Sequence, residues 1–349
     1  MSNSPIAPNS TLMYQEAHEA ADVVAQQFER NDTAIRALVD TLQRTPPRFI
    51  VTCARGSSDH AATFAKYVFE TQLGLVTASL SPSINSVYAA EQKLDGALYI
   101  TISQSGKSPD LVRNAQAAKL AGAHVVALVN VEDSPLALAA DTVIPLHAGP
   151  EKSVAATKSY ICSLAAILHI AARWNNDGAL LDALRAVPAA MRATWSADWS
   201  TLEDGLVDAR NLFVVGRGLG LAAAQEAALK FKETSGLHAE AFSAAEVKHG
   251  PMAIVGPGFP VLFFVQPDDT WEGTLELARE FRERGANVWI AAPGEMSLPN
   301  VLPVAETLHP ACTPLVAISR FYRAANAIAL RRGRNPDVPP HLRKVTETV

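Results

Sequence analysis

The sequence is poor in the features that mark several specialised classes of protein. Among 349 residues there are only three cysteines, Cys53, Cys162 and Cys312, which lie in apolar runs without the spacing of a metal site. No apolar run approaches the roughly 20 residues that span a bilayer. The opening residues MSNSPIAPNS also lack the charged and apolar regions of a signal peptide. We therefore expect a reduced, cytoplasmic protein without a membrane segment.

Positive charge is scarce as well. The formal net charge is -5, and the 30 lysines and arginines are scattered along the chain. They form no basic stripe of the kind that neutralises nucleic-acid phosphates, so we expect no nucleic-acid partner. What the chain does have is apolar residues, at 48% of the total, which is enough to build a core for each of about two ordinary domains.

Short β-branched runs alternate with alanine-rich helical stretches, and this alternation is typical of parallel α/β sheets. Four such runs lie in each half of the chain. The predicted strands are Phe49–Cys53, Leu98–Ser103, His124–Asn130, Thr142–Leu146, Asn211–Gly216, Pro260–Gln266, Asn287–Ala292 and Asn300–Val304. The segments that start at Phe49 and Leu212 share a strand, an Arg-Gly turn and a long helix, which indicates an internal duplication. The fold class is therefore α/β, with two tandem doubly wound units.

The segments between these units set the expected boundaries. We expect an N-terminal helix from about Leu12 to Thr45 within residues 1–45, a first unit at 46–194, a second at 195–335 and a tail at 336–349. The alanine-rich stretch from Trp174 to Trp199 predicts one or two linking helices that are broken at Pro188. Three prolines in the tail favour an extended backbone there.

Two polar segments follow predicted strands, where parallel sheets bind ligands. They are the turn Arg55-Gly56-Ser57-Ser58 and the loop from Ser103 to Ser108, SQSGKS. The loop offers hydroxyls, an amide, backbone N–H groups and the start of a helix near Pro109, which together favour a phosphate. The simpler alternative is a helix cap, with Ser108 capping and Pro109 at the first helical position. Because four polar side chains fall within six residues, we favour the phosphate site.

Other patterns are weaker. The segment GRGLG at 216–220 departs from the dinucleotide pattern Gly-x-Gly-x-x-Gly at Leu221, and a tight strand-to-helix turn explains it better. The chain contains no Walker-type phosphate loop. Histidines and carboxylates are present, but neither His-x-x-x-His nor Cys-x-x-Cys spacing supports a metal, so we expect none.

The densest run of charged and polar residues is 230–252, KFKETSGLHAEAFSAAEVKHGPM. A solvated helix surface is the usual explanation of such a run. However, Gly236 is expected to end the helix, which predicts that the later histidines and carboxylates lie in a loop bounded by Gly250 and Pro251. A carboxylate there could move a proton between adjacent carbons, and a histidine could open a sugar ring.

Four motifs resemble the sugar isomerase (SIS) half of glucosamine-6-phosphate synthases. They are SQSGKSPD, EKSVAATKSY, LKFKETSGLHAEAFSAAEVKHGP and HLRKVTE, and the resemblance runs from about Met13 to the C-terminus. The serine motif is shared by many sugar-phosphate binders, whereas the Lys-x-x-Glu block and the lysine tail are more specific. The resemblance implies two tandem flavodoxin-like SIS subdomains, each an α/β/α sandwich.

The resemblance also implies roles for individual residues. The positions expected to bind the sugar phosphate are Ser58, Ser103, Gln104, Ser105, Ser108, Val154 and Ala155. Glu233 matches the proton-transferring glutamate, with Lys230 one helical turn earlier. His249 matches a ring-opening histidine that relatives donate from the neighbouring subunit, which implies a homodimer. Lys344 matches a tail lysine that can form a Schiff base with a ketose, chemistry that an amine held partly neutral can perform.

The sequence departs from these relatives at three places. Lys107 stands where an acidic residue is usual, so the loop is more cationic. One residue is missing between Lys344 and Val345, which affects the alignment of the tail. No glutaminase domain precedes the sugar domain, and we therefore expect that glutamine is not the intrinsic nitrogen source.

The resemblance then implies a glucosamine-6-phosphate deaminase that yields fructose 6-phosphate and ammonia without a redox or metal cofactor. Its partner is a small sugar phosphate. The alternatives that stay open are an aminotransferase-like isomerase, a deaminase of galactosamine 6-phosphate or a fructosamine conjugate, and a non-catalytic sugar-phosphate sensor. The sensor would leave Glu233, His249 and Lys344 without a task.

Overall fold

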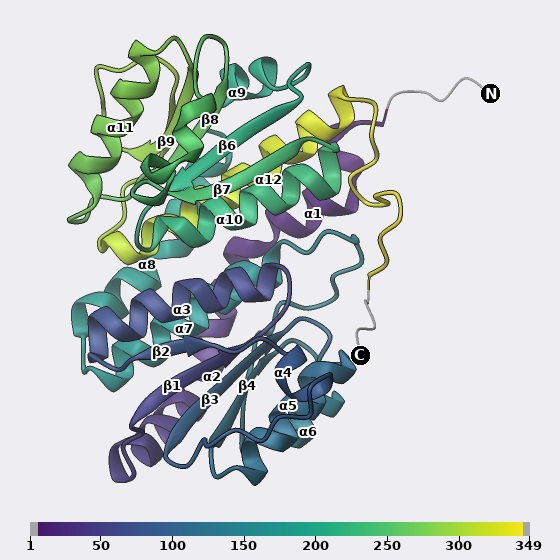
Figure 1. Cartoon of the computed structure of the whole chain (residues 1–349), viewed down its shortest axis with the longest axis vertical. Helices are drawn as coiled ribbons and strands as arrows, with labels where there is room; N and C mark the ends of the chain where they lie inside the picture. The colour runs from purple at the N-terminus through teal and green to yellow at the C-terminus, as the bar shows by residue number, and fades with distance from the viewer. Residues whose placement is uncertain (1–5, 345–349) are drawn as a thin grey trace. The chain divides into compact units, whose positions relative to one another are not determined.

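The computed structural model describes residues 6–344, and this part of the chain divides into two compact units. The first unit comprises residues 22–151 and 159–185 together with Arg343 and Lys344. The second comprises the chain up to Ala21, residues 152–158 and residues 186–342. Each unit is built around its own parallel sheet (Figure 1).

The first unit contains a five-stranded parallel sheet in the order β2-β1-β3-β4-β5. Its strands are β1 (Phe49–Cys53), β2 (Thr77–Ser79), β3 (Ala97–Ser103), β4 (His124–Val129) and β5 (Thr142–Pro145). The helices along this part of the chain are α2 (Ala20–Arg44), α3 (Ser57–Leu73), α4 (Ser83–Ser86), α5 (Pro109–Leu120), α6 (Pro135–Ala139), α7 (Lys158–Trp174) and α8 (Gly178–Trp195).

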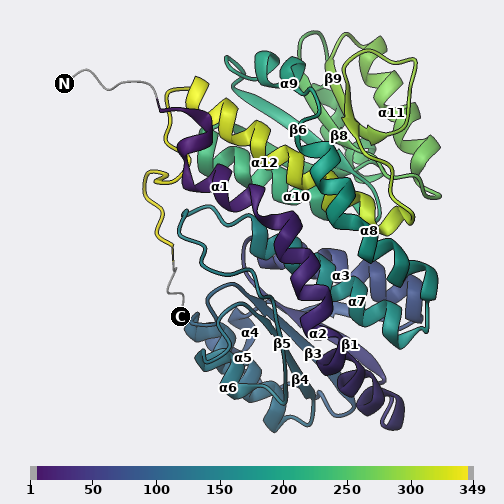
Figure 2. The ribbon, with the colours of Figure 1, turned by 180° about the vertical axis from the view of Figure 1, so that it is seen from behind.

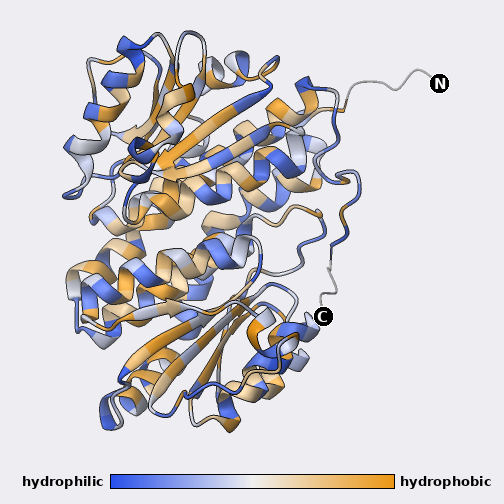
Figure 3. Cartoon of the chain, in the orientation of Figure 1, coloured by the Kyte–Doolittle hydropathy of each residue, from blue (hydrophilic) through white to orange (hydrophobic). Residues whose placement is uncertain are grey.

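Apolar side chains on both faces hold this sheet between helices. Every residue of β3 is buried, as expected for a central parallel strand covered on both sides. Leu111 and Ala115 of α5 pack with Val51 and Tyr99 against one face, and α3 contacts β1, β2 and β3 from the other (Figure 1). The central strands of the sheet are accordingly largely hydrophobic (Figure 3).

The second unit repeats this design, with the strand order β10-β9-β8-β6-β7. Its strands are β6 (Asn211–Gly216), β7 (His238–Ser243), β8 (Pro260–Phe264), β9 (Asn287–Pro293) and β10 (Val301–Val304). Its α-helices are α1 (Leu12–His18), α9 (Ser200–Gly205), α10 (Gly220–Lys230), α11 (Trp271–Glu283) and α12 (Thr313–Arg331). Short helical turns are η1 (Pro8–Ser10), η2 (Phe231–Ser235), η3 (Glu246–His249), η4 (Pro251–Ile254) and η5 (Pro310–Cys312).

Each face of the second sheet has its own helical cover. Phe281 of α11 packs with Phe213, Phe263 and Ile290 on one face. On the other face α10 contacts β6 and β7 and packs against α12, which also contacts α1 (Figure 2). Read from the start of each half, both sheets have the order 2-1-3-4-5, so the predicted pair of doubly wound, flavodoxin-like units is confirmed.

All eight predicted strands are present, to within two residues at either end. The sequence missed the two edge strands β2 and β7. The sequence predicts a loop over residues 238–249. This prediction is wrong for His238–Ser243, which pair with β6. Gly236 does end the helix before it, in the left-handed conformation with φ 55°. An edge strand with one exposed side carries polar residues, so it lacks the apolar run on which the prediction relied.

Two helix predictions also need correction. The expected single helix from Leu12 to Thr45 is two helices, which meet at Glu19. The predicted break at Pro188 was wrong, because α8 runs through it. The buried Leu184, Val187 and Met191 hold the helix together around the proline, so packing outweighs the one hydrogen bond that proline removes.

Two further observations bear on the class of protein. The three cysteines are buried and none forms a disulfide. Over residues 6–344, no helix is long and apolar enough to cross a membrane.

Candidate functional site

The strand order of the first unit places a crevice between β1 and β3. In a 2-1-3-4-5 sheet, the chain leaves β1 and β3 toward opposite faces, so the loops that follow these two strands separate and leave room for a ligand. Here those loops are the turn after Cys53 and the serine loop that begins at Ser103.

A pocket of about 330 Å³ lies at this crevice. It is lined by Arg55, Gly56, Ser58, Ile102, Ser103, Gln104, Ser105, Ser108, Leu111 and Lys344. Five of the predicted sugar-phosphate residues and the predicted tail lysine, far apart in the sequence, are thus brought together. The volume is that of a small-molecule site.

The serine loop is held open by its own backbone. The amide of Gly106 donates to Ser103 Oγ at 3.0 Å, and the amide of Lys107 donates to Ser105 Oγ at 3.3 Å. Gly106 has φ 62°, and an added Cβ would lie 2.1 Å from Ser134 Oγ, so only glycine fits. This conformation of the loop therefore requires glycine at position 106.

Ser108 distinguishes the two interpretations of this loop. It stands at the N-cap position of α5 with Pro109 after it, as a helix cap predicts, but its side chain makes no capping hydrogen bond. Ser108 is instead one of the residues that line the pocket. The first turn of a 12-residue helix thus begins at the pocket, where the helix dipole favours an anion. Within that turn Pro109 has no N–H group, and the amide of Leu111 donates to Asp110 Oδ1 at 2.8 Å.

The cations at the pocket are not the one that the sequence singled out. Lys107 is exposed and is not among the lining residues. Arg55 lines the pocket, and both its Nε and its Nη2 donate to Asp110 Oδ2, at 2.9 and 2.7 Å. Lys344 lines it too, with its Nζ 3.9 Å from Glu151 Oε2. Glu151 in turn accepts hydrogen bonds from the backbone amide and hydroxyl of Ser159.

The second unit holds the predicted proton-transfer pair. Lys230 ends α10, and Glu233 lies on η2, a single π-helical turn that continues it. Lys230 Nζ lies 2.6 Å from Glu233 Oε2 and 3.4 Å from Glu226 Oε1, and Tyr322 donates its hydroxyl to Glu226 at 3.0 Å. A π-turn changes the helical phase over a few residues and is often found at functional sites.

The three side chains of this cluster differ in how far they are exposed to solvent. The side chains of Lys230 and Glu226 are 1% and 0% exposed, whereas Glu233 keeps 21%. Burial pulls the pKa of Lys230 down, but the carboxylates of Glu226 and Glu233 outweigh it and hold that pKa above its usual value. Lys230 is therefore a buried cation, and Glu233 is the most exposed of the three side chains.

The remaining predicted residues lie in the second unit as well. His249 is exposed at the end of η3, next to Gly250. Ala155 is buried, and the backbone amide of Val154 donates to the carbonyl of Asp337 at 3.3 Å. Within residues 6–344, no three His, Cys, Asp or Glu side chains are grouped so that they could hold a metal ion.

Sequence reasoning assigned no role of their own to four side chains that belong to these groups: Arg55, which it placed only within a polar turn, and Asp110, Glu151 and Glu226. Glu226 could have been found, because it precedes Lys230 by four residues on a helix, the spacing of an ion pair. The contacts of Asp110 with Arg55 and of Glu151 with Lys344 join residues far apart in the sequence, so local patterns could not predict them.

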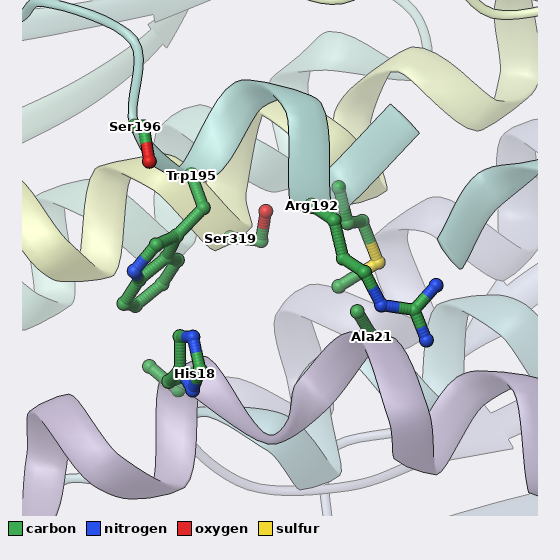
Figure 4. A pocket seen from close by; sticks show the side chains of 8 residues that line it. His18, Ala21, Arg192, Trp195, Ser196 and Ser319 are labelled. Carbon is green, nitrogen blue, oxygen red and sulfur yellow. The ribbon is translucent and has the colours of Figure 1, made fainter. Parts of the chain in front are cut away.

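A second pocket, of about 240 Å³, lies in the second unit (Figure 4). The rings of His18 and Trp195 meet edge to face there, with centroids 5.1 Å apart, and Arg192 and Ser319 also line it. None of the predicted site residues lines this pocket.

Comparison with known proteins agrees with this geometry. The model of the family described as "SIS domain" matches residues 46–173 and 205–292, more than half of the chain. A glutamine–fructose-6-phosphate aminotransferase (isomerizing) from Methanothermobacter thermautotrophicus is 33% identical over 340 residues. The match covers 95% of this chain but 57% of that protein, so the chain spans little more than half the length of such relatives.

Solved structures show the same fold. A protein named only as a candidate phosphosugar isomerase, from Silicibacter pomeroyi, is 41% identical with a TM-score of 0.89, covering 94% of this chain and all of that one. Glucosamine-6-phosphate deaminase from Thermotoga maritima, at 20% identity and a TM-score of 0.76, covers 97% of this chain and 100% of that one. At that identity the likeness shows the fold alone.

Proposed function

Because the chain belongs to the SIS domain family, we propose that it converts glucosamine 6-phosphate and water to fructose 6-phosphate and ammonia. The observation that carries the proposal is the pocket that gathers Ser58, the serine loop and Lys344 at the start of α5. Hydroxyls and helix N–H groups suit a phosphate. Glu233, which is held by the buried Lys230, supplies the acid–base group that aminosugar chemistry requires.

The chemistry needs one proton to move between adjacent carbons. In the open-chain sugar, Glu233 removes the proton on C2, and the electron pair forms a C1–C2 enolamine while the C1 oxygen gains a proton. Glu233 then returns its proton to C1, and the nitrogen gives up one proton, which balances the proton that the C1 oxygen gained. A C1 alcohol and a C2 imine result. Water adds to the imine and ammonia leaves, giving the ketose. Atoms and electrons balance without an external oxidant.

The lysines have separate tasks in this proposal. Lys230 holds one oxygen of Glu233 through the 2.6 Å contact and so orients the carboxylate. Lys344 lines the same pocket and lies beside Glu151, which supports a role in which its amine attacks the open-chain carbonyl. Lys344 is thus proposed to act on the carbonyl, and Lys230 only through Glu233.

His249 is proposed to open the sugar ring in the site of a second copy of the chain, in a homodimer. Its exposure supports this role, because an exposed side chain is able to reach a neighbouring subunit. Mixed dimers test it: Glu233→Gln and His249→Ala chains, each inactive alone, should recover activity when they are co-assembled, because one of the two sites is then intact. Isolated mixed dimers without activity would exclude the shared site.

The direct test is to assay the purified chain with glucosamine 6-phosphate for ammonia and fructose 6-phosphate. Glu233→Gln should lower turnover by about 100-fold or more, the usual contribution of a general base, while the affinity for sugar phosphate persists. Exchange of the C2 proton with solvent deuterium reports the proton-transfer step independently of ammonia release. A folded protein that is inactive on every aminosugar phosphate would remove the proposal.

One alternative has specific support, since the relative from Methanothermobacter thermautotrophicus named above is a glutamine–fructose-6-phosphate aminotransferase. The same groups would then run toward amination of fructose 6-phosphate. A panel with glucosamine, galactosamine and fructosamine 6-phosphates, and with fructose 6-phosphate plus ammonium or glutamine, separates the substrates and the direction. If sugar phosphates bind but none reacts, the chain is a sensor.

A further inference from the structure

Arg55 lies between the two segments that form the phosphate pocket, which are the turn after β1 and the serine loop with the start of α5. It follows β1 in the turn that carries Gly56 and Ser58, and all three residues line the pocket. Its partner Asp110 comes from the other segment, in the first turn of α5 directly after the serine loop. The guanidinium bridges the loops that follow β1 and β3, with Nε and Nη2 both on one carboxylate oxygen.

The two partners differ sharply in exposure. The side chain of Asp110 is 0% exposed, and that of Arg55 is 46% exposed. A buried carboxylate at the start of α5 opposes the binding of a second anion there, because like charges repel. The partial positive charge of the helix N-terminus is smaller than the charge of one carboxylate, so it does not offset both anions. Arg55 offsets that charge. An arginine also carries five N–H donors in a rigid plane, so the two bonds to Asp110 leave three donors that those bonds do not use, on a residue that lines the pocket.

We propose that Arg55, fixed by Asp110, is a phosphate-binding group of this pocket and determines its affinity for the phosphate dianion. This inference rests on the proposed function only in taking the pocket to hold a phosphate. The exposed Lys107, which the sequence placed within the serine loop, takes no part in that contact.

The competing explanation is that Arg55 only ties the two loops together. The two explanations predict different effects of Asp110→Asn on the affinity for phosphate. Removing either partner breaks the tie, so Arg55→Met and Asp110→Asn would then weaken phosphate binding alike. If Arg55 binds the phosphate, Arg55→Met weakens binding, whereas Asp110→Asn removes the opposing charge and leaves binding unchanged or tighter.

Inorganic phosphate, titrated into the full-length chain by calorimetry, measures this directly. Arg55→Met should raise the Kd about tenfold or more, since hydrogen bonds to charged groups are individually strong. Arg55→Lys keeps a cation without the planar fork, and its Kd should lie between the two. Arg113→Met, which removes an exposed cation from the same helix, should change the Kd by less than about twofold and so controls for general charge.

The outcomes are separable. Equal weakening by Arg55→Met and Asp110→Asn, or no weakening by Arg55→Met, overturns the inference, as does a wild-type chain that binds no phosphate. Should Arg55→Met fail to fold, the comparison of Arg55→Lys with Asp110→Asn decides the same question. Phosphate binding does not depend on turnover, so a chain that binds phosphate through Arg55 but releases no ammonia would contradict only the proposed function.

Discussion

Lys230 Nζ lies 2.6 Å from Glu233 Oε2 and 3.4 Å from Oε1 of the fully buried Glu226. The lysine is thus flanked by one inaccessible carboxylate and one accessible carboxylate. Because Glu226 supplies the charge that keeps Lys230 cationic, Glu233 is oriented by the ammonium without having to neutralise it alone. The geometry separates one partly exposed carboxylate from the two buried groups beside it.

The first prediction concerns this cluster. Lys230→Met should lower the free energy of unfolding by about 3–5 kcal/mol, because it leaves the buried carboxylate of Glu226 without its cation. Chemical denaturation measures the change. Adding Glu226→Gln should recover part of the loss, since the buried charge is then gone, while turnover stays low because Glu233 has lost its orienting contact. A double variant as unstable as the single one would contradict this account.

The second prediction concerns the serine loop. Gly106→Ala should lower stability by about 1–3 kcal/mol, as overpacking does, and should weaken phosphate binding, because the new Cβ would overlap Ser134. Gly74→Ala is the matched control. Gly74 has nearly the same φ, 67° against 62°, but an added Cβ there meets nothing within 4 Å. It therefore carries the strain of the left-handed backbone without the overlap, and phosphate binding should be unaffected.

A third prediction concerns Asp337 in the second unit. Its two carboxylate oxygens accept the amides of Leu12 and Met13 at the start of α1, each at 2.7 Å, and its carbonyl accepts the amide of Val154. Asp337→Ala should cost about 0.5–2 kcal/mol, the range of helix caps, and lower the melting temperature. Asp337→Asn keeps one acceptor and should cost less. An unchanged melting temperature for Asp337→Ala would show that these contacts add nothing in solution.

The fourth prediction is a pH dependence set by His169 and Asp32 in the first unit. Burial lowers the pKa of His169 to about 4, outweighing the Asp32 carboxylate 3.2 Å from its Nε2. Although burial opposes it, hydrogen bonds from Arg36 and Arg173 lower the pKa of Asp32 to about 2. In both cases the unfolded chain takes up a proton at a higher pH than the folded chain does, so stability falls on acidification.

The two groups act in different pH windows. Protonation of His169 in the unfolded chain begins near its ordinary pKa of 6.5, so its contribution is lost between about pH 6.5 and 4 and is on the order of 3 kcal/mol. The contribution of Asp32 is lost between 3.8 and about 2. Denaturation measured from pH 7 to 4 should show this slope, and His169→Gln should flatten it. A variant with an unchanged slope would place the titration elsewhere.

The fold could be predicted from the sequence largely because its signals are local. Phe49–Cys53 and Asn211–Gly216 are buried apolar runs that end in turns, and their hydrophobicity alone identifies them as central strands. The edge strand His238–Ser243 escaped prediction because it is defined by its pairing with β6 rather than by an apolar run. Pro188 misled in the opposite direction, since a local helix breaker is overridden by the buried face around it.

The site divides in the same way. The sequence by itself determined the strand-turn-helix alternation, the duplicated unit and the serine loop, since each depends on residues that are close along the chain. Only the tertiary structure decided which cations accompany that loop. Arg55 and Asp110 are 55 residues apart, and Lys344 stands almost 200 residues beyond Glu151. Contacts across such separations depend on strand order and burial, which no local pattern encodes, and for this reason the sequence did not show that Arg55 and Lys344, rather than Lys107, line the pocket.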